Sequence, residues 1–265
     1  MKNLRITSLM AENVDFLGRA MARYMAEQLG IATEFVDDIP WQERERLLDA
    51  SQIHVGWICG LPYVRKVDRS NPRIELLAAP VMQAARYEGR PVYFSDVVVR
   101  RDSRFRTFAD LRGASWAFNE PGSQSGYNVV RYHLATLGEV PGYFGKVIES
   151  GAHQASLQMI LDGQIDGSAI DSTVLELELK RDPAIRSQFR IIETLGPSPI
   201  PPWVVLRSVS PELRKDLREL LLHMHQDPQG RAVLAEAQMA RFAYVEDGDY
   251  DAIRRMARQA ELVTL

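Results

Sequence analysis

Short apolar runs alternate with amphipathic segments along the chain, which is the pattern that βα units produce. Strands are predicted at residues 4–10, 33–36, 53–59, 74–82, 115–118, 146–149, 167–170, 189–193 and 203–206. Helices are predicted at residues 14–29, 41–50, 125–137, 154–161, 173–180, 211–225, 230–237 and 250–262. The alternation predicts an α/β protein with helices packed against its sheets.

Two longer β segments, at residues 91–100 and 201–207, bracket the middle block of this series. They resemble two crossover strands of a chain that leaves one lobe, builds a second and returns. We therefore predict lobe 1 from residues 1–97 and 203–265, and lobe 2 from residues 98–202. A chain of 265 residues is long enough for two such lobes. In open α/β sheets, ligands lie beyond the carboxyl ends of the strands.

Composition excludes several classes of function. Hydrophobic residues make up 46% and charged residues 25% of the chain, as in a soluble globular protein. The formal net charge of -3 gives no sign of a nucleic-acid partner. A single cysteine, Cys59, excludes an internal disulfide and a cysteine-rich zinc site. No stretch approaches the length of a membrane span, so no membrane insertion is expected.

The common motifs of catalysis and of metal or cofactor binding are not found. The sequence has no Gly-x-Ser-x-Gly elbow, Walker A loop, Rossmann glycine fingerprint or His-Glu-x-x-His helix. Its five histidines are scattered along the chain. We therefore expect a protein that is not an enzyme, with no cofactor and no metal site.

The segment Asn119-Glu-Pro-Gly-Ser-Gln-Ser-Gly-Tyr127 is the most informative part of the sequence. It follows a short apolar strand and runs into an amphipathic helix, so it brings backbone N–H groups and the positive end of a helix dipole to one point. The hydroxyls of Ser123 and Ser125 add further donors. This arrangement suits a small tetrahedral oxyanion. The alternative is an ordinary helix cap, since serine is a preferred capping residue.

Other polar and aromatic residues fall where strands end or helices begin: Tyr63, Tyr93, His153 and Asp171. Each has a structural alternative. The tyrosines are common core or rim residues, His153 could cap its helix, and Asp171 is well suited to cap the helix from Thr173. The last group consists of possible pocket-wall residues: Trp57, Cys59 and Trp203.

Asp171 gives the sharpest hypothesis about the ligand. A carboxylate beside an anion is repelled by it, and the repulsion is severe in a partly dry cleft. The contact becomes favourable when the ligand donates a proton, as hydrogen phosphate or a monoprotonated phosphonate can. Sulfate has no such proton at neutral pH. Asp171 would therefore select protonated oxyanions, or bind an amine on the ligand.

The motifs resemble the substrate-binding proteins of phosphonate, phosphite and phosphate ABC transporters. The resemblance rests on Phe108-Ala-Asp-Leu-Arg-Gly113, Pro121-Gly-Ser-Gln-Ser-Gly-Tyr127, Gly60-Leu-Pro-Tyr63, Ser150-Gly-Ala-His153, residues 161–171 and Pro201-Pro-Trp-Val-Val205. It implies a two-lobe type II periplasmic binding-protein fold, with two mixed sheets and two crossover strands, that holds its ligand between the lobes. Gly122 and Gln124 depart from the pattern, where hydroxyl or other small residues are more usual.

The resemblance also implies a ligand set and a partner. Ser123, Gln124 and Ser125 would hold the oxyanion, Tyr93, His153 and Asp171 would complete the pocket, and Tyr63 would close it from lobe 1. The partner would be an ABC permease if the chain is exported, and the location of the chain would then be the periplasm. The run Met1–Met10 is too short for a signal peptide, so a cytoplasmic location stays open.

Two alternatives to the transport function remain at this point. A cytoplasmic or sensor-linked protein of the same fold could bind another small metabolite, with the aromatic residues stacking on an organic group. An enzyme similar to a thiamine-precursor synthase could use His153 or Cys59. The absence of an evident acid–base pair disfavours the enzyme.

Overall fold

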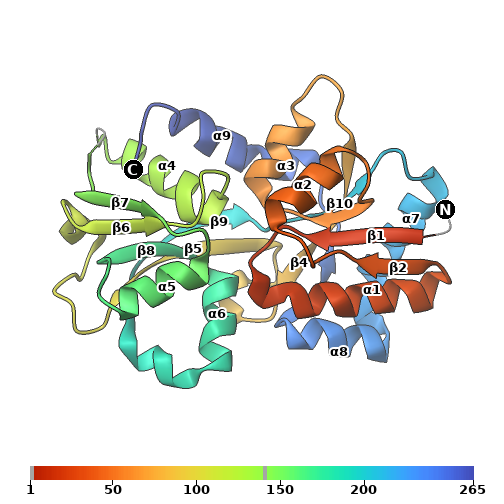
Figure 1. The fold of residues 1–265 in the computed structure, drawn as a ribbon, viewed down its shortest axis with the longest axis horizontal. Helices are drawn as coiled ribbons and strands as arrows, with labels where there is room; N and C mark the ends of the chain where they lie inside the picture. The colour runs from red at the N-terminus through yellow and green to blue at the C-terminus, as the bar shows by residue number, and fades with distance from the viewer. Residues whose placement is uncertain (1–2, 140–141) are drawn as a thin grey trace. The chain divides into compact units, whose positions relative to one another are not determined.

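The computed structural model describes residues 3–139 and 142–265. The chain forms two compact units: unit 1 comprises Met1–Val92 and Pro199–Tyr250, and unit 2 comprises Tyr93–Ser198 and Asp251–Leu265. Each unit is a mixed sheet flanked by helices (Figure 1). The mixed α/β architecture predicted from the hydrophobic pattern is confirmed.

Unit 1 contains a six-stranded sheet in the order β11-β4-β10-β3-β1-β2. Strand β1 is parallel to β2 and β3, whereas β10 is antiparallel to β3 and β4, and β11 to β4. The strands are β1 (Asn3–Ser8), β2 (Ala32–Phe35), β3 (Val55–Trp57), β4 (Ile74–Met82), β10 (Trp203–Leu206) and β11 (Met239–Ala243).

Five helices cover the faces of this sheet. They are α1 (Asp15–Leu29), α2 (Trp41–Asp49), α3 (Gly60–Val67), α7 (Pro211–His223) and α8 (Pro228–Glu236). Helices α1 and α8 pack together on one face, and α2 and α3 lie on the other (Figure 1). The apolar positions at 3.6-residue spacing in α1 bury Leu17, Met21 and Met25 against the sheet.

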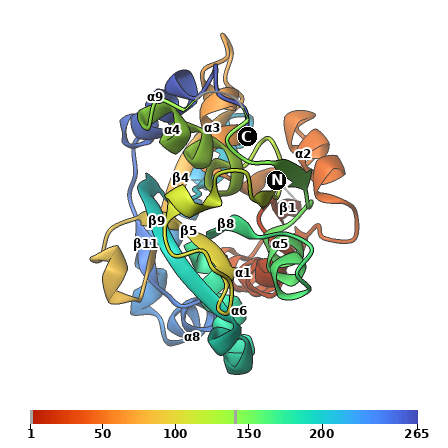
Figure 2. The ribbon, with the colours of Figure 1, turned by 90° about the vertical axis from the view of Figure 1, so that its left-hand side faces the viewer.

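Unit 2 contains a five-stranded sheet in the order β7-β6-β8-β5-β9, of which Figure 2 labels β8, β5 and β9. Its strands are β5 (Val92–Arg100), β6 (Ser115–Phe118), β7 (Lys146–Glu149), β8 (Gly167–Asp171) and β9 (Phe189–Pro199). Its helices are α4 (Val129–Thr136), α5 (His153–Leu161), α6 (Ser172–Arg181) and α9 (Asp251–Gln259). Strand β9 extends through the proline-rich segment, which an edge strand tolerates because its outer side needs no N–H donors.

Both faces of the unit 2 sheet are buried, and β5 shows how. Val97 and Val99 point into a cluster with Trp116 and α4, while Val98 points into the opposite cluster with α5 and α6. Side chains of a strand alternate between faces, so three consecutive valines require packing on both sides. The apolar run in the sequence is therefore explained by helices above and below.

The C-terminal helix differs from its predicted place. The sequence predicts residues 203–265 as one part of lobe 1, but Asp251–Leu265 belongs to unit 2, so the chain passes between the units three times. The Arg131 guanidinium of α4 donates to the backbone carbonyls of Ala260, Glu261 and Val263. Val263 is buried in the cluster around Trp116. These long-range contacts are invisible in the local pattern from which the lobes were predicted.

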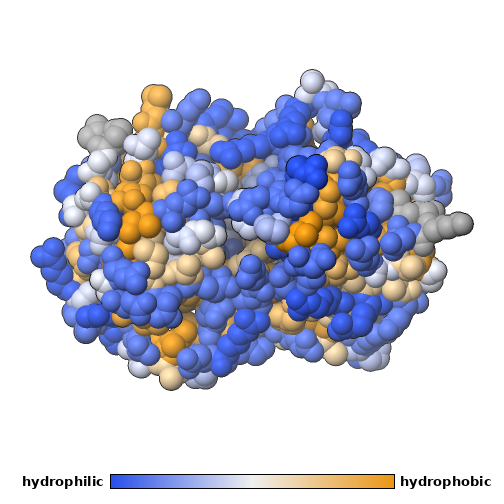
Figure 3. Space-filling model, in the orientation of Figure 1, coloured by the Kyte–Doolittle hydropathy of each residue, from blue (hydrophilic) through white to orange (hydrophobic). Residues whose placement is uncertain are grey.

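The surface in Figure 3 is largely hydrophilic, and its hydrophobic residues form separate patches on each unit. Among the described residues, the exposed large hydrophobic side chains are Leu137, Ile191, Tyr244 and Leu262. Within the same part of the chain, no helix is both long and apolar enough to span a membrane.

Candidate functional site

Three parallel strands of unit 2 end at one edge of its sheet. Strand β6 pairs in parallel with β7 and β8, so their carboxyl ends at Phe118, Glu149 and Asp171 lie side by side. Each strand is followed by the start of a helix: a π-helical turn at Gln124–Asn128 that continues into α4, then α5, then α6. Helix starts carry outward N–H groups and partial positive charge, so this edge favours an anion.

Ser123, Ser125 and His153 meet at this edge and are called here the serine cradle. The Oγ of Ser125 lies 3.1 Å from Nε2 of His153 and 3.5 Å from Oγ of Ser123. All three side chains are buried, with exposed fractions of 3%, 3% and 6% respectively. The loops are tied together by backbone bonds, in which Ser150 donates to the Phe118 carbonyl and Gly151 to the Asn119 carbonyl.

The serine cradle retains donor protons after its internal bonds are made. Ser123 Oγ accepts the N–H of Gly126 at 3.0 Å, which caps the helix start and leaves the hydroxyl proton to donate elsewhere. Ser125 and neutral His153 together carry two polar protons and use one in the bond between them. In one tautomer the remaining donor is the Ser125 hydroxyl, and in the other it is His153 Nδ1–H. One donor remains in either case.

Within residues 3–139 and 142–265, the buried polar atoms without a hydrogen-bond partner include Asn119 Oδ1 and His153 Nδ1 at this edge. Such atoms are costly unless a ligand or solvent satisfies them. Gly126 explains their close approach, because a Cβ there would stand 2.0 Å from Asn119 Oδ1 and 3.2 Å from His153 Cε1. Asn119 was not among the predicted site residues, although its position just after a strand was a usable signal.

Gln124 takes a different role from its serine neighbours. It is fully buried, and its Nε2 donates to Ser198 Oγ at 3.2 Å and lies 3.1 Å from Met256 Sδ. Its Oε1 accepts from Asn128 at 2.7 Å. These bonds hold the side chain inside unit 2, where it links the helix start to β9 and α9. Glutamine at this position departs from the family pattern, and its side-chain amide makes hydrogen bonds inside unit 2.

Asp171 caps α6, as its structural alternative predicted. Its Oδ1 accepts the Thr173 N–H at 2.8 Å and the Thr173 hydroxyl at 2.7 Å. Burial raises the pKa of Asp171 from 3.8 to about 6, against the lowering effect of the Thr173 and Val174 hydrogen bonds, and Asp96 raises it further. A carboxyl group with a pKa near neutrality can hold or share a proton under physiological conditions.

His153 does not cap α5, because the cap position is Ala152 and no side-chain bond is made there. Burial lowers the pKa of His153 from 6.5 to about 4. The imidazole is therefore neutral at neutral pH, and its bond to Ser125 is a bond between uncharged groups.

Tyr93 lies at the same sheet edge through the antiparallel pairing of β5 with β8. Ser95 of β5 is opposite Asp171, so Tyr93 near the start of β5 lies beyond the end of β8. The N–H of Phe94 donates to Ser172 Oγ at 3.1 Å, which fixes the start of β5 to the start of α6. Tyr93 itself is 1% exposed.

The remaining predicted residues belong to unit 1. Tyr63 is buried in α3, donates from its hydroxyl to Asp247 Oδ1 at 2.8 Å and packs against Tyr250 at 4.8 Å between ring centroids. Trp57 and Trp203 are register partners, with stacked rings 5.9 Å apart, and both are buried. Cys59 is partly exposed and precedes α3. The tryptophans are core residues of the unit 1 sheet.

Comparison with known proteins gives a consistent family and fold. The family model for the phosphonate periplasmic substrate-binding proteins of ABC transporters matches residues 12–250. The binding-protein component of an ABC phosphonate transporter from Pseudomonas aeruginosa has a TM-score of 0.85 at 19% identity, covering 98% of this chain and 86% of that chain. PhnD1 from Prochlorococcus marinus, solved in complex with methylphosphonate, has a TM-score of 0.86 at 18% identity and 98% coverage of both chains.

A more distant match is a Xanthomonas citri protein solved bound to ATP, with a TM-score of 0.75 at 16% identity and 98% coverage of both chains. These structures establish the type II periplasmic binding-protein fold that the sequence motifs implied. The family match covers most of the sequence, and on that ground the chain belongs to the phosphonate periplasmic substrate-binding proteins of ABC transporters.

Proposed function

We propose that the serine cradle binds the phosphoryl oxygens of a small phosphonate or related phosphorus anion. The observation that carries the proposal is the retained donor protons of Ser123 and of the Ser125–His153 pair, at an edge where three helices begin. Hydroxyls, a neutral imidazole and backbone N–H groups bind an oxyanion by dipoles, without a full positive counter-charge. Tyr93 would border the ligand, and Gln124 would act through the position of its backbone.

Asp171 would accept the acidic proton of the ligand. With a pKa of about 6, its carboxyl group is mostly ionised at neutral pH but close enough to protonation to share one proton with an anion beside it. Hydrogen phosphonate supplies that proton and sulfate does not. The proposed selectivity is therefore for phosphorus anions over sulfate.

The related structures support this ligand class. PhnD1 from Prochlorococcus marinus was solved with methylphosphonate, and the Xanthomonas citri protein was solved with ATP, which also carries phosphoryl groups. The family is the substrate-binding component of ABC transporters. We infer an ABC permease as the partner of this chain and the periplasm as its location, because a substrate-binding component delivers its ligand to the permease there.

The enzyme alternative is less well supported by the chemistry of the site. A general base works best with a pKa near the working pH, and the pKa of His153 is about 4. The metabolite alternative retains one favourable observation, the ATP-bound relative, which would correspond to a larger organic phosphate. A ligand panel that contains both small phosphonates and nucleotides separates these two candidates.

The direct test is calorimetric titration of the full chain with methylphosphonate, 2-aminoethylphosphonate, phosphate, ATP and sulfate. We expect saturable binding of a phosphonate and none of sulfate. Ser125→Ala should weaken the phosphonate by about tenfold or more, because a hydrogen bond to a charged group contributes about 1.5–3 kcal/mol. Ser187→Ala is the matched control, since Ser187 is exposed and bonds only locally to Ala184. Sulfate binding of equal strength would contradict the proposed selectivity.

A second titration examines the role of Asp171. Methylphosphonate is titrated in buffers of different ionisation enthalpy at a pH above 7, where Asp171 and the ligand are both largely deprotonated. We expect the wild-type protein to take up a proton from the buffer on binding, because the shared proton must be supplied. Asp171→Asn should abolish this uptake, since the amide can donate to the dianion directly. Equal proton uptake in the two proteins would remove Asp171 from the mechanism.

A further inference from the structure

Unit 2 contains a second polar cavity, at the opposite edge of its sheet from the serine cradle. The cavity has a volume of about 580 Å³ and is bordered by Arg100, Ser103, Arg104, Gly163 and Asp166, among others. Strand β5 ends at Arg100, while β6 begins at Ser115 and β8 at Gly167. The two sites are thus separated by the length of β6, which for four residues is roughly 13 Å.

The cavity lies beside a basic segment of the chain, two of whose arginines, Arg100 and Arg104, border it. Residues 100–106 contain four arginines and one aspartate. Asp102 pairs with Arg100 at 2.6 Å. Arg106 and Arg190 both donate to the backbone carbonyls of Ser103 and Phe105, which are neutral acceptors and do not cancel the charge. Desolvation and the neighbouring Arg106 and Arg101 lower the pKa of Arg190, as expected among crowded cations.

Two donors at the cavity have no acceptor for their bonds. Among the described residues, no carboxylate forms an ion pair with Arg104, whose guanidinium lies 5.2 Å from the Phe105 ring centroid. In the same part of the chain, the buried Oγ of Ser103 has no hydrogen-bond partner.

Among the described residues that border the cavity, the one carboxylate is that of Asp166, and it bonds to Ser115. Oδ2 of Asp166 accepts the N–H and the hydroxyl of Ser115 at 2.8 and 2.7 Å. These bonds hold the start of β6 and engage Oδ2 of Asp166 within unit 2.

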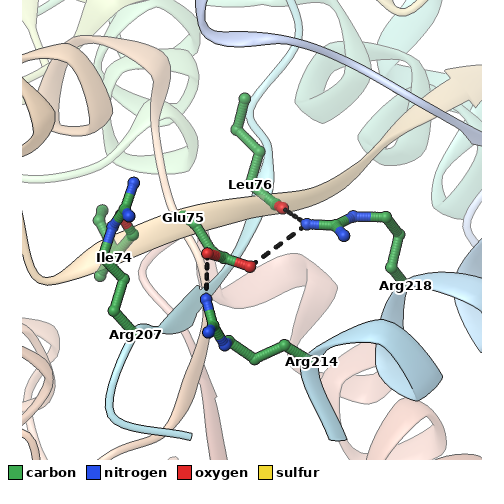
Figure 4. A network of polar contacts seen from close by, with 6 residues as sticks. All are labelled: Ile74, Glu75, Leu76, Arg207, Arg214 and Arg218. Carbon is green, nitrogen blue, oxygen red and sulfur yellow. Dashed lines mark hydrogen bonds and ion pairs between the residues drawn. The ribbon is translucent and has the colours of Figure 1, made fainter. Parts of the chain in front are cut away.

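Unit 1 shows what a purely structural arginine network looks like in this protein. Arg214 and Arg218 both pair with Glu75, and Arg218 also donates to the Leu76 carbonyl at 2.8 Å (Figure 4). Two cations there share one partly buried counter-ion on a neighbouring strand. The basic cavity of unit 2 has no equivalent of Glu75 among its bordering residues, since Asp166 serves Ser115.

We propose that the basic cavity is a second anion site, which takes a soluble small molecule with two or more negative charges on phosphoryl groups. Guanidinium groups bind phosphoryl oxygens in a fork geometry, and a serine hydroxyl adds a third donor. The volume lies in the range of small-molecule sites and exceeds what a single phosphate would fill. The site is independent of the proposed phosphonate site, because it shares no residue with the serine cradle.

The test is titration of the full chain with inorganic pyrophosphate in the presence of saturating methylphosphonate. We expect saturable binding that the double variant Arg100→Gln/Arg104→Gln weakens by about tenfold or more, because each lost charge-assisted bond is strong. Arg186→Gln is the control for the loss of a positive charge, as it removes one charge from an exposed position of unit 2 and should leave pyrophosphate binding close to that of the wild type. Ser125→Ala should leave pyrophosphate binding unchanged.

Three results would overturn the proposal. They are no saturable binding to the wild-type protein, equal binding to the double variant, and loss of pyrophosphate binding in Ser125→Ala. Arg104→Lys provides a charge-retaining check on folding and should keep most of the binding. Vesicles containing phosphatidic acid present the same phosphoryl chemistry on a surface. Binding of vesicles without binding of pyrophosphate would also contradict a soluble ligand.

Discussion

The two units differ in the chemistry at the carboxyl ends of their parallel strands. In unit 1, Ser8 ends β1 and accepts the N–H of Met10, while Trp57 ends β3 and donates to the Pro201 carbonyl. Ser8 keeps its hydroxyl proton after this bond, but the Trp57 indole N–H is used and its ring stacks on that of Trp203. In unit 2, the corresponding edge carries two serines and a histidine that keep donor protons after their internal bonds.

The carboxyl ends of parallel strands thus carry different kinds of residue in the two units. Stacked tryptophans belong to the core at the edge of unit 1, whereas the edge of unit 2 carries the hydroxyls and helix starts at which we propose that an anion binds. The comparison predicts that substitutions in unit 1 lower stability more than ligand affinity. Substitutions at the edge of unit 2 should affect the ligand directly.

The largest expected effect is on stability, from Trp203→Ala. Trp203 is fully buried, stacks on Trp57 and meets Phe242 edge to face. Its truncation should lower the free energy of unfolding by about 3–5 kcal/mol, measured by chemical denaturation. Methylphosphonate affinity, titrated where the variant is folded, should stay within about threefold of wild type, a change of well under 1 kcal/mol.

Trp41→Ala is the matched control, because Trp41 is only partly buried at the start of α2, and it should cost less stability. A large loss of ligand affinity in Trp203→Ala, with Trp41→Ala unaffected, would make Trp203 a pocket wall and break the comparison between the units.

A somewhat smaller effect should appear in the pH dependence of stability, where two buried groups of unit 2 oppose each other. The raised pKa of Asp171, about 6 against 3.8, stabilises the fold fully below pH 3.8, and this contribution is lost as pH rises through 6. The lowered pKa of His153, about 4 against 6.5, stabilises the fold above pH 6.5, and this contribution is lost as pH falls through 4. Each contribution is about 3 kcal/mol.

As pH changes, the contributions of Asp171 and His153 to the free energy of unfolding change in opposite directions and nearly cancel in the wild-type protein. A variant that removes one of the two groups should therefore reveal the contribution of that group. Relative to wild type, the free energy of unfolding of Asp171→Asn should rise as pH increases from about 4 to 6. That of His153→Gln should fall as pH increases from about 4 to 6.5. Urea denaturation at a series of pH values gives both difference curves. If the two difference curves changed with pH in the same direction, burial would not shift the pKa values of Asp171 and His153 in opposite directions, as we infer.

The elements of this fold were largely predictable because they depend on local pattern. Strand β6 and the helix start after it follow directly from Trp116-Ala-Phe118 and the Gly/Ser turn. Strand β11 was missed, because its five residues alternate only weakly and lie on an edge beside β4. The placement of α9 was also missed, since it depends on Arg131 and Trp116, which lie far from it in sequence.

The site was predictable to the extent that it follows strand ends. Ser123, Ser125, His153 and Asp171 were identified because each lies just after a strand, and the structure brings the first three into one cluster. Their roles as ligand contacts remain predictions. The inward turn of Gln124 could not be read from its neighbours, because Ser198 and Met256 come from distant segments. Side-chain direction at a helix start depends on such tertiary partners.

The smallest expected stability effect also tests the site most directly, through Gly126→Ala. The new Cβ would stand 2.0 Å from Asn119 Oδ1, so the Asn119 side chain or the helix start must move. Overpacking of this kind costs about 1–3 kcal/mol of stability. The new Cβ would also stand 3.2 Å from His153 Cε1, so we expect the imidazole to shift relative to Ser125 and methylphosphonate affinity to fall by about tenfold or more, as for the loss of a hydrogen bond to a charged group.

Gly122→Ala is a control within the same loop, because the nearest atom to its Cβ is Glu120 Oε1 at 3.7 Å, an ordinary contact. It should change neither stability nor affinity beyond the small effect of an alanine in a turn. If Gly126→Ala bound methylphosphonate as tightly as Gly122→Ala, the close packing of Asn119, Gly126 and His153 would serve only the fold. The distinction between a closed edge in unit 1 and a binding edge in unit 2 would then rest on the serine hydroxyls alone.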